Sequence, residues 1–143
     1  MTDNHIVAAT PRWFILAAVG AVLWEILGCA MFILQATTDI TTLPRDQQAA
    51  WAATPAWMNM AWGFAVVTGL AGAVLLAMRK RKAEPLLLLS FLAAVVQFSG
   101  LVLVPELRNL IGSDDLLMPF VVALVCYGVW HLARHARTRG WLG

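Results

Sequence analysis

Trp24-Glu25-Ile26-Leu27-Gly28-Cys29 places a carboxylic acid halfway along an apolar segment that runs from Trp13 to Gln35. Insertion scales put the cost of a carboxylate at the centre of a membrane helix at about 2.5 to 3.5 kcal/mol. Such a residue is usually paired, protonated or turned toward a cavity, since burial disfavours its charged form. We therefore expect a small membrane helix bundle with Glu25 as its central ionisable group.

The composition indicates an integral membrane protein. Hydrophobic residues make up 61% of the chain and charged residues 13%, whereas soluble domains contain about 45–50% apolar and about 25% charged residues. The 143 residues hold four apolar segments of about 20 residues, the length that a membrane helix needs. Because little else remains, we predict a single membrane domain over residues 1–143. The formal net charge of +2 gives no indication of nucleic-acid binding.

The fold class that follows is all-α, a bundle of four transmembrane helices of the left-handed type. The helices are predicted at about residues 12–36, 57–78, 86–104 and 117–135. Their connections are short, so neighbours in the sequence should pack antiparallel to each other.

The first eleven residues, with Asp3 and His5, should form a short polar arm, and Pro11 suits the first turn of the helix after it. A secretory signal is an alternative because Arg12 supplies a positive flank, but the apolar stretch exceeds the usual ~7–15 residues. The sequence Ile26-Leu27-Gly28-Cys29 loosely resembles a lipoprotein cleavage signal, yet apolar residues follow it. We expect neither cleavage.

The longest connection, residues 37–54, has an internal pattern. From Leu43 to Trp51 a proline is followed by residues that favour helix. We predict a short interfacial helix there, with Pro44 at its first helical position. Thr54 should be the N-cap of the second membrane helix.

Tryptophans cluster where this loop returns to the membrane. Trp51, Trp57 and Trp62 follow one another at short spacing, as in the aromatic belt at a membrane interface. Membrane anchoring is the simpler interpretation. An aromatic lid over a ligand is the alternative.

A basic cluster, Arg79-Lys80-Arg81-Lys82, separates the second apolar segment from the third. Pro85 should restart the chain into the third helix at Leu86. That helix should end near Pro105, and residues 107–116 should be a loop before the fourth helix. The basic cluster could bind anionic lipid head groups, but its simpler role is to fix the topology.

Charges divide unequally between the two ends of the predicted bundle. One end carries Arg12, Arg79, Lys80, Arg81, Lys82, Arg134, Arg137 and Arg139. The other end carries Arg45 and Arg108 against Asp39, Asp46, Glu106, Asp114 and Asp115. By the positive-inside rule, both termini are expected in the cytoplasm, and the strong bias argues against dual topology.

This orientation allows the depths of polar residues to be compared. Glu25 and Gln97 lie about 18–20 Å from the cytoplasmic start of their helices, at ~1.5 Å per residue. Thr68, Cys126 and Tyr127 fall near the midpoints of their own spans. We predict a ligand- or proton-binding layer of Glu25, Gln97, Tyr127 and Thr68, with no catalytic residue and no metal ligand.

Small residues accompany the polar ones at helical spacing, which marks the packed side of a membrane helix. On the first helix these residues are Ala18, Ala21, Glu25, Gly28, Cys29 and Phe32. On the third helix they are Ser90, Ala94, Gln97, and Gly100 or Leu101. We expect these two faces to be packed, and association with a second copy or another protein could use them.

Three roles stay open for Glu25. In the first, Glu25 is a neutral acid that hydrogen-bonds to Gln97 or Tyr127 and holds the helices together. In the second, it is a functional group that binds a proton or a ligand. In the third, it contacts another subunit. Burial alone does not choose among them.

Other reactive side chains give weaker signals. Cys29 and Cys126 lie near mid-membrane on different helices, which favours two small core residues over a disulfide. His131 and His135 have the spacing of a two-ligand metal face, but no acid or cysteine is near them, so an interfacial pair is expected. The sequence has no phosphate loop, paired carboxylates or Ser-His-Asp set, and we predict neither an enzyme nor a cofactor.

As a whole, the chain resembles a group of small four-helix bacterial inner-membrane proteins that are sometimes labelled sugar transporters. The resemblance lies in Pro55-Ala56-Trp57, the basic cluster, Gln97 and the segment from Ala136 to Trp141. It implies the bacterial inner membrane, crossed several times, as the location, and it implies no established activity.

Helix one alone has a second, local resemblance. Glu25-Ile26-Leu27-Gly28-Cys29 is similar to the first helix of the small multidrug resistance transporters, in which one glutamate binds protons and cationic drugs in turn. The chain departs from that family in its long first outer loop, its third helix without tryptophan and its one-sided charge.

The leading hypothesis is a protein that binds or transports a small molecule and exchanges a proton for it at Glu25. Gln97 and Tyr127 would orient the ligand, and Trp24 or Phe32 would supply an apolar wall. The alternative is a non-catalytic accessory or scaffold subunit of a larger membrane complex. Expected partners are membrane lipid, a small-molecule ligand, and either a second copy or a larger complex, but no nucleic acid.

Overall fold

The structure is a computed structural model that describes residues 9–143, and over this range it is helical and contains no strand. In chain order the elements are α1 (Arg12–Thr37), η1 (Ile40–Thr42), α2 (Arg45–Ala53), α3 (Ala56–Ala77), α4 (Ala83–Leu103), α5 (Pro105–Leu110), η2 (Asp114–Leu116) and α6 (Leu117–Thr138). Most of the predicted polar arm, including Asp3 and His5, lies outside the described residues. The all-α fold class is confirmed.

Four of these helices, α1, α3, α4 and α6, are long and apolar enough to cross a membrane. They correspond to the four predicted spans, with ends that differ by a few residues. The largest shift at a helix start is in α4, which begins at Ala83 rather than at Leu86. Pro85 fits inside the first turn because the first N–H groups of a helix have no partner within it.

Prolines set the starts of three helices. Pro11, Pro44 and Pro55 each occupy the N-cap in an extended conformation, immediately before α1, α2 and α3. The short helix predicted in the first loop is present as α2. Three details of the predicted helix starts are wrong: Pro11 and Pro44 each lie one position before their helices, and Thr54 is the C-cap of α2 rather than the N-cap of α3.

The loop predicted over residues 107–116 contains helix α5 and the 3₁₀ turn η2. Pro105 opens α5 at its first position, where its missing N–H is harmless. Leu107 of α5 is buried, with 2% of its surface exposed. Helix α5 has six residues, which is too short for an apolar period to distinguish it from a loop.

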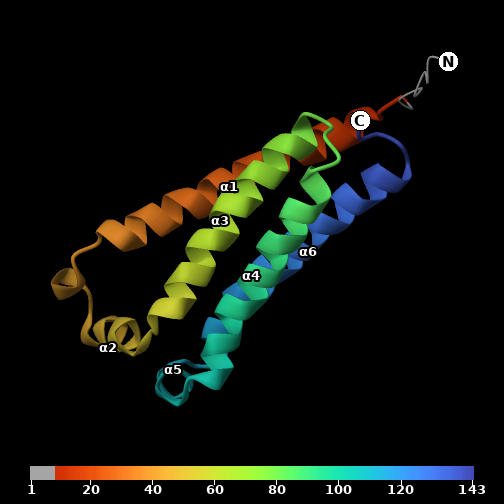
Figure 1. Cartoon of the computed structure of the whole chain (residues 1–143). Coiled ribbons are helices and arrows are strands. Elements are labelled where there is room, and N and C mark those ends of the chain that lie inside the picture. The colour runs from red at the N-terminus through yellow and green to blue at the C-terminus, as the bar shows by residue number, and fades with distance from the viewer. Residues whose placement is uncertain (1–8) are drawn as a thin grey trace.

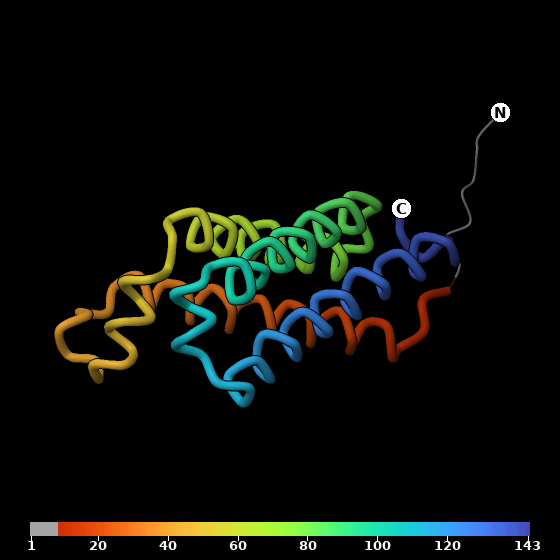
Figure 2. Tube along the Cα trace, turned by 90° about the horizontal axis from the view of Figure 1, so that it is seen from below, coloured from red at the N-terminus to blue at the C-terminus, as the bar shows by residue number. Residues whose placement is uncertain are grey.

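The helices pack in the order of the chain. Helices α3 and α4 form the most extensive contact, α1 packs on α3, and α6 packs on α4 (Figure 1). Figure 2 shows α1 and α6 on the same side of the α3–α4 pair. The close approach of α3 and α4 uses Gly72, where a Cβ atom would lie 2.7 Å from Leu87 Cγ.

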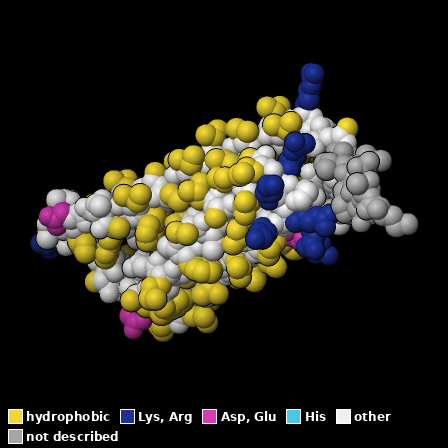
Figure 3. All heavy atoms as spheres, turned by 45° about the horizontal axis from the view of Figure 1, so that its top comes forward, with side chains coloured by type: hydrophobic (Ala, Val, Ile, Leu, Met, Phe, Trp, Pro, Cys, Tyr) yellow, Lys and Arg dark blue, Asp and Glu magenta, His cyan; other side chains and the backbone are white. Residues whose placement is uncertain are grey.

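The two ends of the molecule differ in charge and in packing. We call the end with residues 78–82 the hairpin end and the end with α2 and α5 the loop end. Lysine and arginine side chains gather at the hairpin end (Figure 3). There a core of buried residues joins all four long helices: Phe14, Ala18, Leu76, Ala83, Leu87, Ala133, Ala136 and Leu142.

Leu142 closes this core from outside the helices. Helix α6 ends in a turn at Gly140, whose φ of 71° is in the left-handed region. The chain then returns to the basic hairpin, where the Gly143 N–H donates to the Arg79 carbonyl over 2.8 Å. Leu142 is 2% exposed, and Trp141 packs on Phe14 with ring centroids 5.4 Å apart.

Candidate functional site

Glu25 lies on the buried face of α1. Ala18 and Ala21 precede it on the same face, and all three residues are buried, with Glu25 5% exposed. Its carboxyl group rests on the backbone of α3 at Gly69, where a Cβ atom would lie 2.7 Å from Glu25 Cδ. The absence of a side chain at position 69 therefore makes room for the acid between α1 and α3.

The Glu25 carboxyl has no hydrogen-bond partner among residues 9–143. The Ser90 hydroxyl of α4, which also lies beside Gly69, donates to the carbonyl of Ala65 over 2.8 Å. A buried carboxyl normally has partners, because an unpaired polar group in an apolar environment is costly. In the described part of the chain, the predicted hydrogen bond from Glu25 to Gln97 or Tyr127 is therefore not formed.

A cavity of about 630 Å³ lies next to this carboxyl. Its lining comes from all four long helices, and it includes Glu25 of α1, Ala65 of α3, Ser90 of α4 and Cys126 of α6. The volume falls in the range of about 300–1,000 Å³ that is usual for small-molecule sites. Most of the lining is apolar, with Trp24, Trp62 and Phe98 as aromatic walls.

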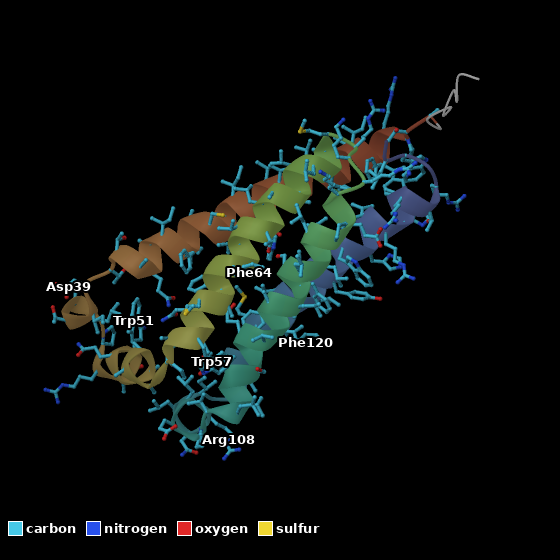
Figure 4. All side chains as sticks on the ribbon, in the orientation of Figure 1. Asp39, Trp51, Trp57, Phe64, Arg108 and Phe120 are labelled. Carbon is cyan, nitrogen blue, oxygen red and sulfur yellow. The ribbon has the colours of Figure 1, made fainter. Side chains whose placement is uncertain are left out.

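A second cavity of about 220 Å³ adjoins the large one at the loop end. Gln35, Thr54 and Asn59 line both cavities, and Gln47 and Trp51 of α2 complete the smaller one. Figure 4 shows Trp51 on the side of α2 toward the end of α1. The large cavity thus reaches the loop end through a polar region, whereas the hairpin end beyond Glu25 is filled by the buried core.

The structure brings two of the four predicted site residues to one cavity. Glu25 from α1 and Gln97 from α4 both line it. The predicted inward face of α4 is confirmed, because Ser90, Ala94 and Gly100 are buried and Gln97 is half-buried. The predicted wall residue Trp24 also lines the cavity, while Phe32 packs edge-on against Trp62 with ring centroids 5.2 Å apart.

The other two predicted site residues do not line the cavity. The Thr68 hydroxyl donates to the Phe64 carbonyl of its own helix over 2.7 Å, so it is already satisfied. Tyr127 is 44% exposed and packs with Phe91 of α4, with ring centroids 5.7 Å apart. Its neighbour Cys126 faces the cavity instead. Equal depth had suggested the layer, but depth does not fix the rotation of a helix.

Asn59 and Gln35 are site residues that the sequence argument overlooked. Each lies near an end of an apolar segment, where a polar residue is ordinary and gives no signal. Trp62 had been interpreted as part of a membrane-interface belt, yet it lines the cavity. A search for polar residues one or two turns inside the helix ends would have found Asn59.

The remaining reactive side chains are placed as follows. Cys29 and Cys126 are both free thiols, and the Cys29 thiol lies 3.7 Å from the Val66 carbonyl. His131 packs near Tyr127 and His135 packs near Trp141, with ring centroids 6.0 Å and 5.6 Å apart. Within residues 9–143 no three of the acids, cysteines and histidines come together as a metal site would require.

Comparison of the chain with protein-family models, with curated proteins and with solved structures gave no match in any of the three.

Proposed function

We propose that this chain is inserted in the bacterial inner membrane through α1, α3, α4 and α6, with the hairpin end and both termini in the cytoplasm. The length and apolar character of the four helices support insertion. Lysine and arginine gather at the hairpin end, whereas α2 and α5 each carry a single basic residue, Arg45 and Arg108, which supports the orientation by the positive-inside rule.

In that setting we propose a protein that binds a small molecule, and transports it, with Glu25 as the group that exchanges a proton for the ligand. The observation that carries this proposal is a mid-helix carboxyl that has no hydrogen-bond partner among residues 9–143 and whose oxygens border a cavity of about 630 Å³. A purely structural acid would be expected to have a partner within the protein. Gln97, on the same cavity, supplies an amide that can orient a ligand.

One-sided access supports transport over simple binding. The cavity extends to the loop end, the outer side in the proposed orientation, and the buried core around Phe14 and Leu142 closes the cytoplasmic side. A transporter with its site near the membrane centre opens to the two sides in turn. The structure would then correspond to a state that faces outward.

Proton binding at Glu25 can be tested without knowing the substrate. Trp24 and Trp62 line the cavity, so tryptophan fluorescence in phosphatidylcholine nanodiscs should change when Glu25 titrates. We expect the tryptophan fluorescence of the wild type to change with pH, and Glu25→Gln to remove the part of that change that comes from Trp24 and Trp62. The variant Glu84→Gln serves as a control, because that acid lies at the hairpin end. An identical titration of wild type and Glu25→Gln would overturn the proposal.

The second candidate is a scaffold or accessory subunit of a larger membrane complex. A different observation favours it: Gly20 and Gly128 face open space, and among residues 9–143 no side chain or neighbouring helix lies within 4 Å of a Cβ built at either position. Exposed glycines let another helix approach closely in a membrane. Gly20→Leu and Gly128→Leu would then release a co-purifying partner, and they would leave the fluorescence titration unchanged.

A further inference from the structure

The groups that line the two cavities restrict the charge of a ligand. Apart from Glu25 and the Cys126 thiol, the lining has no ionisable side chain: no lysine, arginine, histidine or aspartate lines either cavity among the described residues. An anionic head group would therefore find no cation, and it would face Glu25. Burying an unpaired charge is costly, so anionic ligands are disfavoured.

The polar lining is dominated by amides. Gln35, Asn59 and Gln97 line the large cavity, and Gln47 lies beside the first two. Each amide presents two N–H donors and one carbonyl acceptor. An ammonium group offers only N–H donors, and a quaternary ammonium group offers none, so either one could neutralise the charge of Glu25 and would leave the amide N–H groups unmatched. A head group with several hydroxyls both donates and accepts, and it can satisfy the carboxyl and the amides together.

The cavity also has an open apolar side. Leu27 and Met31 of α1 and Met118 of α6 line it, yet they are 56%, 52% and 67% exposed. Helices α1 and α6 meet at the hairpin end through the buried core, and they separate toward the loop end (Figure 1). In the proposed orientation, this opening between α1 and α6 faces the lipid acyl chains.

Taken with the proposed function, on which this step rests, we propose that the ligand is a single-chain amphiphile with an uncharged, hydroxyl-bearing head. The head hydroxyls donate hydrogen bonds to the Glu25 carboxylate in place of its proton and to the Gln97 amide oxygen, and the chain passes between Leu27 and Met118 into the membrane. The polar region around Asn59 lets the head move between the loop end and Glu25. The volume of about 630 Å³ suits one small amphiphile.

Cys126 is a native reporter for this site, because it lines the cavity whereas Cys29 does not. The Cys29→Ser protein in phosphatidylcholine nanodiscs is alkylated with N-ethylmaleimide in the presence of three probes of equal chain length. The probes are monolauroylglycerol, laurate and dodecyltrimethylammonium. We expect monolauroylglycerol at ten times its Kd to slow alkylation about tenfold, and the two charged probes at that concentration to slow it less than about twofold.

Two variants show whether protection depends on the proposed contacts. Gln97→Leu should lose most of the protection by monolauroylglycerol, and Asn59→Leu, which changes the path rather than the site of the head, should slow the onset of protection without reducing its final extent. Asn109→Leu is the matched control, since that asparagine is exposed on α5 and lines neither cavity. If Asn109→Leu also lost protection, the loss in the site variants would reflect damage to the fold. That result would contradict the proposed contacts.

The outcomes separate this inference from the proposed function. Stronger protection by dodecyltrimethylammonium or laurate, equal protection by all three probes, or protection by none would overturn the neutral amphiphile. The proposed function is judged by the fluorescence titration of Glu25→Gln, which uses no amphiphile. A titration that is lost in Glu25→Gln, together with best protection by a charged probe, would retain the proton site and reject the ligand class.

Discussion

The carboxyl group of Glu25 occupies the space that a side chain at Gly69 would need: a Cβ atom at position 69 would lie 2.7 Å from Glu25 Cδ and 2.8 Å from Ser90 Oγ. An acid on α1, a glycine on α3 and a serine on α4 thus meet at one point. Because Gly69 has no side chain, the carboxyl can lie against the backbone of α3 and still border the cavity. The site therefore depends on a residue that has no functional group.

Gly69→Ala should destabilise the protein by about 1–3 kcal/mol, the usual cost of adding a methyl group to a packed interior. The added Cβ must displace the Glu25 carboxyl, the Ser90 hydroxyl or both. Unfolding in bicelles measures the change. Gly20→Ala is the matched control, since no neighbouring side chain or helix of the described residues lies within 4 Å of its Cβ, and it should be neutral or stabilising by up to about 1 kcal/mol. Equal effects of the two substitutions would contradict the contact.

A second prediction concerns Glu25 and Gln97. They line the same cavity, but no hydrogen bond joins them in the described part of the chain. Without ligand, the effects of Glu25→Gln and Gln97→Leu on the free energy of unfolding should therefore add to within about 0.3–0.5 kcal/mol. With a ligand that bridges them, the same double-mutant cycle should become non-additive. Strong coupling in the empty protein would instead support the locked pair.

Much of the fold could be predicted because its signals are periodic and local. The apolar spans, the prolines before α1, α2 and α3, and the small-residue faces of α1 and α4 are all visible in the sequence. The spacing from Ala18 to Glu25 predicted the buried face of α1, and the structure confirms it. These features depend on one helix at a time.

The site was less predictable because it depends on how helices are rotated against each other. Residues at equal depth can face different neighbours: Cys126 borders the cavity, while Tyr127, about 100° further around α6, packs with Phe91. Thr68 is buried yet bonded to its own helix. The outcome for Tyr127 follows from contacts between α4 and α6, which spacing does not reveal, whereas the Thr68 bond lies within α3, where Ser and Thr often donate to the carbonyl four residues back.

The third prediction tests the orientation with single cysteines in a protein that carries Cys29→Ser and Cys126→Ser. Thr41→Cys and Ser113→Cys at the loop end should react with a membrane-impermeant maleimide added to intact cells, and Lys80→Cys at the hairpin end should not. All three positions are exposed, so access is decided by the membrane rather than by packing. Lys80→Cys should react after the cells are opened. Its labelling in intact cells would reverse the proposed orientation.

The last prediction concerns the closure of the hairpin end by Leu142, which is 2% exposed between Phe14 and Ala133. Leu142→Ala should cost about 2–5 kcal/mol in unfolding free energy, as other buried leucine truncations do. It should also open a path to Cys126, so that an impermeant maleimide supplied from the cytoplasmic side of inverted vesicles labels that thiol faster than in the wild type. Leu103→Ala is the matched control, because Leu103 is 70% exposed. Unchanged labelling in a folded Leu142→Ala protein would show that other core residues keep the cytoplasmic side closed.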